Sequence, residues 1–562
     1  MSDKHGGQMK LKLTRVRLGQ GGTVKKLSIS AAIVLGLAGA ANAADMPIPT
    51  KAWTPPAAVP AACTGLTDFL LSNCLLSWYG VTFYGTVDMG GTYQTHGTPF
   101  DPNFPTGASY FLNPTNRSAG FGLGPNAMSQ SNVGVKIIEP IAGGWSFVSQ
   151  NELAFDPYSG LLANAPQALQ NAIGVPQTQQ LLPVDSSRWG WLAGTNAAGV
   201  SSPVYGTLLF GRQNSLLNDA VVAYDPMGAA YAFSPIGYSG KVAGAGDTEE
   251  ARWTTAIKYR VNIGDFRLAV EGQPIGGSTG GYDAYNPNNG AISGGIGGDI
   301  KNVVPGVISL DVFGTFEKDA VNIGTNYAAG PTLNSSGLAI GNFQPAFLTA
   351  TVSNQTSVMA VGKWSFGSWG NTPPPVVGKA APAPSGPSGI PLTLYGGYEW
   401  VQYANPSDPQ SSFNDDGFSF LLGPSGVNGH GQAAGGNNTS INNNAYNSNC
   451  GKGAGCTDQI FQVFWVGAKY GITKNLDVIG AYYHYDQDQF VITTAKNECA
   501  NPTQLGQCAG TGDMASAVLD WRFLPKWDAY IGTFYSTFGG GLVKGYLASS
   551  NLATTSGVRF RF

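Results

Sequence analysis

Six cysteines form three close pairs along the chain: Cys63 with Cys74, Cys450 with Cys456, and Cys499 with Cys508. Each pair brackets a short segment, so local disulfides are the simplest of the connectivities that six cysteines allow. Bridges of this kind persist in oxidising compartments outside the cytosol. A zinc site is the rival interpretation of Cys450 and Cys456, but no neighbouring histidine or further cysteine supplies the missing ligands. We expect three local disulfides and no metal.

The sequence shows no persuasive grouping for covalent catalysis. Beyond residue 43 the histidines are scattered, with no carboxylate or cysteine motif around them: His96, His430 and His484. Asp311 and Glu317 share one face of a predicted strand, which is a weak paired-carboxylate signal. The glycine-rich run Gly294–Gly298 lacks the strand–turn–helix setting and the following Lys-Ser/Thr that phosphate binding requires. We therefore expect no enzymatic activity and no cofactor.

The last five residues alternate between apolar and charged side chains. Val558, Phe560 and Phe562 share one face of a strand, and Arg559 and Arg561 share the other. A strand with this pattern has one face in an apolar medium and one in water. A transmembrane β-barrel provides both, because its outer face meets lipid and its inner face meets an aqueous lumen.

The first 43 residues have the layout of a secretory signal peptide. Lys25 and Lys26 precede an apolar run, Leu27–Ala41, that leads into a small-x-small cleavage site. We expect the mature chain to begin at Ala44, and the true start of translation to be Met1, Met9 or later. Beyond this leader no apolar run is long enough to cross a membrane as a helix, so a membrane protein with this sequence must be a barrel.

The composition also fits a barrel. Glycine accounts for 79 of 562 residues and charged residues for only 11%, whereas soluble domains carry about a quarter charged residues. The formal net charge is −3, and the leader holds seven basic residues and one acidic residue. The mature chain is therefore more acidic still, which argues against nucleic acid as a partner.

Alternating segments of about ten residues, separated by turn residues, recur along the mature chain. We expect sixteen strands, at 79–93, 128–139, 145–155, 186–194, 204–212, 251–260, 265–273, 291–302, 307–317, 355–366, 392–403, 459–470, 476–486, 513–523, 528–536 and 551–562. The predicted fold class is an all-β, antiparallel, sixteen-stranded transmembrane barrel.

Short and long connections alternate between these strands. The long ones include 94–127, 213–250, 318–354 and 404–458. Tight turns at one rim, long loops at the other and an even number of strands are typical of outer-membrane barrels. The exception is a Pro-rich segment, 367–391, which we interpret as a periplasmic insert. The predicted domains are the signal peptide 1–43, a Pro/Ala-rich lead 44–77 with the first cysteine pair, and the barrel 78–562.

Aromatic residues gather near the ends of the predicted strands. Trp253 and Tyr259 share the apolar face of 251–260, Trp145 opens 145–155, and Trp521 lies near the end of 513–523. Barrels place such rings at the two membrane interfaces. The pattern predicts that these side chains face lipid.

Several segments, taken in order, resemble the Gram-negative trimeric porins. They are the opening WYGVTFYGTVDMG, residues 205–228, 252–260, 392–407 and 518–532, and the closing GVRFRF. The resemblance covers most of the mature chain. It implies sixteen strands in each barrel, three associated barrels, and a third loop, here 213–250, that folds inward and narrows the pore.

The resemblance also implies a charged constriction, in which arginines on the wall face acidic residues of the third loop. By motif position Arg212 and Arg252 resemble two of these arginines, whereas Asn132 stands where porins often place another. The acidic candidates, of which we favour the first two, are Asp219, Asp225, Asp247, Glu249 and Glu250. Basic side chains on the polar faces of their strands, which are expected to line the lumen, are Lys136, Lys258 and Arg260. The alternative role of Arg212 and Arg252 is to hold the loop to the wall by salt bridges.

The sequence therefore predicts a porin in the outer membrane of a Gram-negative bacterium, a water-filled channel for passive diffusion of small hydrophilic solutes and ions. The expected partners are outer-membrane lipid and lipopolysaccharide, further copies of the chain in a homotrimer, and the barrel assembly machinery. For that machinery, Phe562 and Phe560 resemble the recognition signal. The alternatives are a substrate-specific channel and an adhesin that binds through its long loops.

Overall fold

The structure is a computed structural model of the chain. It describes residues 62–97, 100, 110, 112, 118–160, 194–237, 252–273, 290–320, 332–333, 339–340, 353–369, 387–404, 459–488, 509–543 and 547–562. All of these belong to one unit, Leu37–Phe562. The predicted signal peptide, the centre of the Pro-rich insert and the four cysteines from Cys450 to Cys508 lie outside the described residues. No helix within the described ranges is long and apolar enough to cross a membrane.

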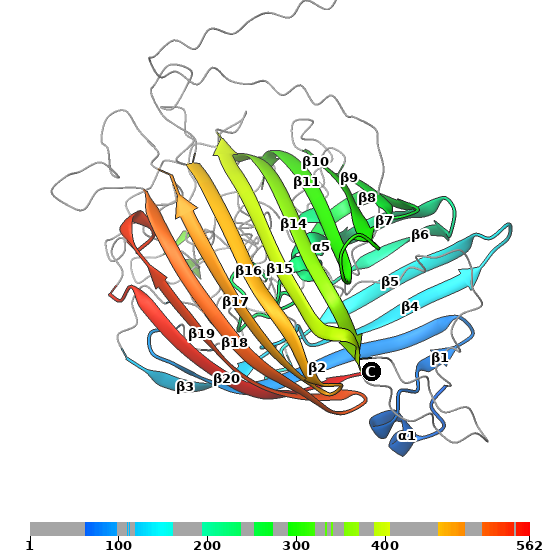
Figure 1. Cartoon of the computed structure of the whole chain (residues 1–562), viewed down its shortest axis with the longest axis horizontal. Coiled ribbons are helices and arrows are strands. Elements are labelled where there is room, and N and C mark those ends of the chain that lie inside the picture. Colours follow the sequence, from blue (N-terminus) through cyan, green and yellow to red (C-terminus); the bar gives the residue numbers. More distant parts are fainter. Residues whose placement is uncertain are drawn as a thin grey trace, which may run out of the picture. The chain divides into compact units, whose positions relative to one another are not determined.

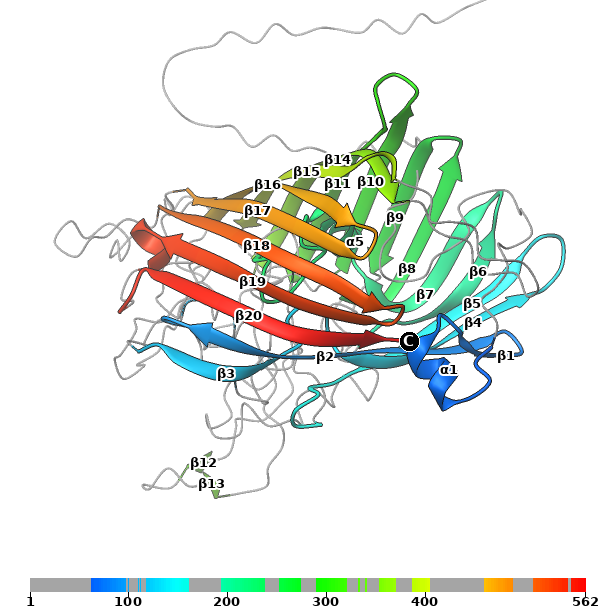
Figure 2. The ribbon, with the colours of Figure 1, turned by 60° about the horizontal axis from the view of Figure 1, so that its bottom comes forward.

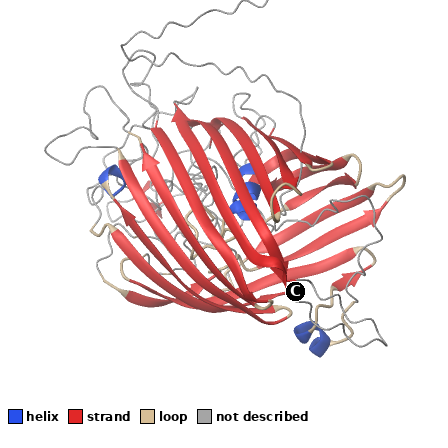
Figure 3. Cartoon of the chain, in the orientation of Figure 1, coloured by secondary structure: helices blue, strands red, loops and turns tan. Residues whose placement is uncertain are grey.

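Antiparallel strands form a closed barrel with sixteen strand positions (Figure 1 and Figure 3). In chain order these are β2 (Val81–Gln94), β3 (Gly120–Pro125) with β4 (Asn132–Pro140), β5 (Ser146–Ala154), β6 (Asn196–Ser202), β7 (Gly206–Asn214), β8 (Arg252–Ile263), β9 (Phe266–Gln273), β10 (Gly290–Lys301), β11 (Val307–Ala320), β14 (Ser353–Trp369), β15 (Pro387–Ala404), β16 (Gln459–Thr473), β17 (Leu476–Gln487), β18 (Gly510–Leu524), β19 (Trp527–Phe538) and β20 (Ser550–Arg561). Each strand pairs with the next, and β20 pairs with β2, which closes the barrel.

The second strand position is made of two pieces. Strand β3 pairs with the second half of β2, and β4 pairs with the first half. Residues 126–131 leave the sheet between them. The Asp88 carboxylate of β2 holds this bulge, because it accepts the backbone N–H groups of Met128 and Ser129, each at 2.8 Å.

The predicted barrel is confirmed, and fifteen of the predicted strands agree with the structure to within a few residues at most of their ends. They include the glycine-rich 291–302, which is β10. The fourth predicted strand, 186–194, is wrong where the structure describes it, because Gly194 lies outside any strand. The strand at this position is Asn196–Ser202. Residues 186–193 lie outside the described residues. The sequence NAAGVSS of β6 lacks the apolar alternation by which strands are found.

The alternation of the strands does not predict several short elements. They are α1 (Leu66–Leu71), β1 (Leu76–Trp78), α5 (Leu216–Tyr224), η3 (Gly540–Val543), and the two-residue strands β12 (Thr332–Leu333) and β13 (Ala339–Ile340). Of these, α5 bears most directly on function.

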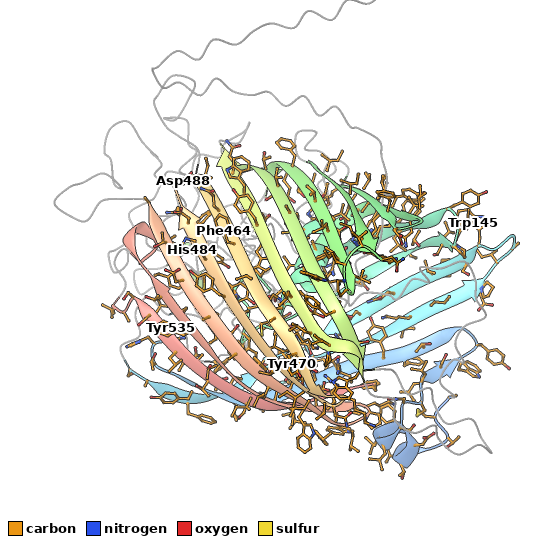
Figure 4. The ribbon with its side chains drawn as sticks, in the orientation of Figure 1. Trp145, Phe464, Tyr470, His484, Asp488 and Tyr535 are labelled. Carbon is orange, nitrogen blue, oxygen red and sulfur yellow. A yellow bond between two sulfur atoms is a disulfide. The ribbon has the colours of Figure 1, made fainter. Side chains whose placement is uncertain are left out.

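The two faces of the barrel wall differ as the alternation predicts. On β20, Val558 is 42% exposed and Arg559 is 8% exposed. The face of Val558 points out and that of Arg559 points in. On β16, Phe464 and Tyr470 are both exposed and lie near opposite ends of the strand (Figure 4). Exposed rings at both ends of a strand are what membrane interfaces favour.

Trp253 is an exception to the predicted aromatic belt. Tyr259 is exposed as expected, but Trp253 is only 1% exposed and is packed with Ala256 and Ala291. The register between β7 and β8 shifts between Gly211 and Gln213, which pair with Ala256 and Trp253. This bulge breaks the alternation on which the prediction for Trp253 depended.

The N-terminal described segment is closed by a disulfide and lies beside the end of the chain (Figure 2). Cys63 and Cys74 are bonded, as predicted, with their Cα atoms 4.9 Å apart. Between them, α1 contributes Phe69, whose ring meets those of Phe560 and Phe562 edge-on at centroid distances of 5.6 and 5.3 Å. The segment then enters the barrel through β1, which pairs with the start of β2.

Candidate functional site

Helix α5 follows β7 and is covered on nearly all sides (Figure 1). The hydroxyl of Ser215 caps its start by accepting the backbone N–H of Asn218 at 3.2 Å. Asp219 lies in the first turn, where the helix dipole favours a negative charge. Leu216 and Val221 are fully buried in a hydrophobic cluster that also contains the inward-facing Trp465 of β16. The helix therefore packs against the inside of the wall.

The start of α5 is held to the wall by charge. The Asp219 carboxylate forms a salt bridge with Lys258 of β8 at 3.0 Å, and Arg260 donates a hydrogen bond to the same oxygen. Lys258 also lies 3.7 Å from Glu271 of β9. Asp219 and Lys258 are nearly inaccessible to solvent, with 3% and 5% exposed. Charges buried at this depth must be paired, and this cluster pairs them.

The end of α5 contacts strands farther round the barrel. The Tyr224 hydroxyl donates to the Asp311 carboxylate of β11, and the Trp465 indole donates to the Tyr224 carbonyl at 3.2 Å. The next residue, Asp225, accepts the hydroxyl of Tyr483 of β17 at 2.6 Å and the backbone N–H of Ala229 at 2.8 Å. Burial raises the pKa of the Asp225 carboxyl, and its hydrogen bonds oppose that rise. The two ends of α5 are thus fixed to different parts of the wall.

Beyond α5 the chain continues along the inner wall. The ring of Phe233 meets the ring of Tyr530 of β19 edge-on at 6.4 Å. The backbone N–H of Ala232 donates to the carbonyl of Ala127, in the bulge between β3 and β4, at 2.9 Å. The described segment 215–237 therefore touches the wall from β8 to the bulge after β3.

Two glycines of β10 make room for this arrangement. A Cβ atom at Gly297 would overlap the Asp311 carboxylate, and one at Gly295 would overlap the ring of Phe313. Arg267 of β9 reaches Asp311 at 3.3 Å through the space at Gly297. The glycine-rich run 294–298, which sequence analysis set aside as a phosphate loop, serves the packing of the wall.

The remaining predicted site residues within the described ranges lie on β4, β7 and β8. Arg212 donates from its guanidinium to the carbonyl of Arg252 at 3.3 Å, so the two residues are adjacent. On β4, the ammonium of Lys136 lies 4.5 Å from the ring centre of Tyr84, whose hydroxyl donates to Glu152 of β5 at 2.9 Å. Asn132 lies at the start of β4, and Asp247, Glu249 and Glu250 lie outside the described residues.

The sequence did not single out the groups that meet the far end of α5. Asp311 was visible only as one of two acids on the polar face of its strand. Arg267 and Tyr483 carried no signal, because a tyrosine or arginine on the inward face of a strand is common in any barrel. Their role follows from the path of α5, which a strand pattern does not contain.

Comparison of whole structures gives similar barrels at low sequence identity. The anion-selective porin from Comamonas acidovorans is 15% identical, with a TM-score of 0.47 over 86% of this chain and 99% of that chain. OmpF of Salmonella typhi in complex with daunomycin is 11% identical, with a TM-score of 0.42 over 86% of this chain and 97% of that chain. OprB of Pseudomonas putida is 10% identical, with a TM-score of 0.43 over 86% of this chain and 94% of that chain. A search of curated protein sequences gives no match.

The family model described as Gram-negative porin matches residues 30–370, which is more than half of the chain. This match agrees with the closed sixteen-stranded barrel, its apolar outer face and its inward-packed segment after β7. The chain therefore belongs to the Gram-negative porin family and is a channel protein of the outer membrane.

Proposed function

We propose that segment 213–250 is the constriction of this porin and sets the size of the hydrophilic solutes that diffuse through it. The observation that carries the proposal is the path of residues 215–237. They contact β8, β11, β16, β17 and β19 from the inside. A segment held at so many points of the inner wall occupies part of the lumen.

The charges of the constriction divide into two groups in this proposal. Asp219 and Asp225 are 3% and 2% exposed and are engaged with wall side chains or backbone, so they fix the segment in place. Lys136, Arg212 and Arg252 keep partial exposure and act on passing solutes. Fixed charges beside a narrow, low-dielectric wall act strongly on ions and polar molecules.

We further propose a homotrimer, with 44–77 as a periplasmic lead and 367–391 as a periplasmic insert. Phe560 and Phe562 form the signal for the assembly machinery. The short connections support this orientation, because the described turns at 264–265, 474–475 and 525–526 lie at one end of the barrel, where β20 also ends. Porins place such turns toward the periplasm.

Deletion of residues 217–236 tests the constriction. Single-channel conductance in planar bilayers should rise, because the deletion removes the segment that is packed inside the wall. A deletion of equal length within the long connection 405–458 is the control for a shortened loop. Unchanged conductance in a 217–236 deletion that still forms channels would show that the segment does not narrow the pore.

A further inference from the structure

A charged strip crosses the inner wall from β16 to β20. Its three acidic members are Asp477 of β17, Asp520 of β18 and Asp528 of β19. Its four basic members are Lys469 of β16, Arg522 of β18, and Arg559 and Arg561 of β20. Lys469 and Arg522 meet Asp477 at 2.8 and 2.6 Å, and Arg559 and Arg561 meet Asp528 at 2.9 and 2.7 Å. Arg522 and Arg559 each lie 3.9 Å from Asp520, which joins the two groups.

The strip faces the lumen near the periplasmic end. Asp520 is buried, whereas its neighbours Leu519 and Trp521 are 42% and 53% exposed on the lipid side. The same alternation holds on β20, where Arg559 points inward and Val558 outward. All the strip residues lie within a few positions of the short turns at 474–475 and 525–526, or of the end of β20.

The two signs of charge are sorted by depth. The side chains of Asp477, Asp520 and Asp528 are 6%, 7% and 1% exposed. Those of Lys469, Arg522 and Arg561 are 39%, 30% and 49% exposed. The three acids are therefore covered and three of the four bases meet the water of the lumen, whereas the fourth base, Arg559, is only 10% exposed and lies opposite Asp88 of β2.

The wall across the barrel lacks this sorting. Lys301 of β10 lies 2.5 Å from Asp265 in the turn before β9, with side chains 42% and 55% exposed. Asp299 of that group is 26% exposed and pairs with Arg267, which is 9% exposed. Acids there meet solvent at least as much as bases do, so that wall presents no excess of positive charge.

We propose that the strip from Lys469 to Arg561 is an anion subsite at the periplasmic mouth of the channel, which takes small anions such as chloride, inorganic phosphate and short carboxylates. The inference rests on the proposed function, because it requires an open channel. A positive surface in a confined aqueous path raises the local concentration of anions and lowers that of cations. The strip and segment 213–250 are made of different residues, so each can be altered by substitutions that leave the other's residues in place.

The double variant Lys469→Gln/Arg561→Gln tests the proposal. It removes the two most exposed bases but leaves each aspartate an arginine, Arg522 for Asp477 and Arg559 for Asp528. The measurement is the reversal potential of single channels in a potassium chloride gradient. We expect the chloride-to-potassium permeability ratio to exceed one in the wild type and to fall about twofold or more in the variant.

Reversing the direction of the salt gradient shows at which mouth of the channel the selective charge lies. Because salt screens charges over about 10 Å at 0.1 M and about 3 Å at 1 M, the anion preference should be larger when the dilute solution bathes the periplasmic side. That difference should vanish in the double variant. Lys474→Gln is the matched control, since Lys474 lies in the exposed turn after β16 and carries the same charge outside the strip.

The outcomes separate this inference from the proposed function. Open channels whose reversal potential is unchanged by the double variant, or changed equally by Lys474→Gln, would overturn the subsite alone. A wild-type barrel that opens no channel would overturn the proposed function and the subsite with it. Should Arg561→Gln impair assembly at the chain end, Lys469→Gln alone should still lower the permeability ratio, and no change would count against the subsite.

Discussion

At the scale of single residues, Asp219 is the acid of segment 215–237 that pairs with cations. It receives Lys258, Arg260 and the side-chain amide of Asn214, the last at 3.1 Å. Asp225, six residues on, is as deeply buried but meets a hydroxyl and backbone N–H groups instead of cations. The two acids therefore fix the same segment by different means.

This difference predicts unequal effects of neutral substitution. Asp219→Asn leaves Lys258 and Arg260 without their main counter-charge and should lower the free energy of unfolding by about 3 kcal/mol. Asp225→Asn keeps one oxygen for the Tyr483 hydroxyl but puts an amide nitrogen opposite the N–H of Ala229, and should cost about 1 kcal/mol. Urea titration of the refolded barrel in lipid vesicles measures both. Equal losses would mean that the cations are satisfied without Asp219.

At the scale of elements, α1 is joined to the end of the chain. The ammonium of Lys526, in the turn between β18 and β19, donates to the carbonyl of Phe69 at 2.9 Å. The indole of Trp527 donates to the carbonyl of Leu70 at 3.0 Å. A hydrogen bond from Ser72 lowers the pKa of the Asp68 carboxyl within the same helix. The disulfide-closed segment 63–74 thus covers the aromatic end of β20 and the neighbouring turn.

We expect this segment to depend on its disulfide. The variant Cys63→Ser/Cys74→Ser removes the cross-link that restricts the unfolded segment. Its local stability should therefore fall by about 3 kcal/mol. Limited proteolysis should then cut within 63–76 while the barrel stays intact. The control is Cys450→Ser/Cys456→Ser, which removes a cysteine pair from a different connection. Equal cutting of wild type and variant at 63–76 would show that the contacts of Phe69 and Lys526 suffice.

Strands could be predicted from the sequence far better than the elements that modify them. A strand of the wall has lipid on one side and water on the other, so its alternation is visible, and even the glycine-rich β10 was found. Strand β6 was displaced because Asn196–Ser202 has small and polar residues on both faces. Trp253 was placed on the wrong face because a bulge reverses the alternation, and no residue type marks that bulge unambiguously.

The inner segment could be predicted only in outline. Resemblance to porins indicated that 213–250 folds inward, and it pointed to Asp219 and Asp225. It did not contain helix α5 or the contacts with Asp311, Trp465 and Tyr483, because these depend on which strands the segment meets in three dimensions. The pairing of Asp219 with Lys258 and Arg260 likewise joins residues about forty positions apart in the sequence.

At the scale of the whole molecule, the outer and inner faces of the barrel are stabilised in different ways. Its outer face carries exposed apolar side chains such as Phe464, Ile531 and Val558, which lipid accommodates. Its inner face carries the packed segment 215–237 and the strip from Lys469 to Arg561. A closed sheet leaves no unpaired strand edge in the membrane, which is the condition for crossing lipid with strands.

The most direct test of the channel function is the current that the refolded barrel carries across a planar lipid bilayer. We expect stepwise, ohmic openings at low voltage, grouped in threes by a homotrimer of barrels. Electrical silence from a preparation whose heat-modifiable migration and circular dichroism show a folded barrel would contradict it, because a folded porin with an open lumen must conduct.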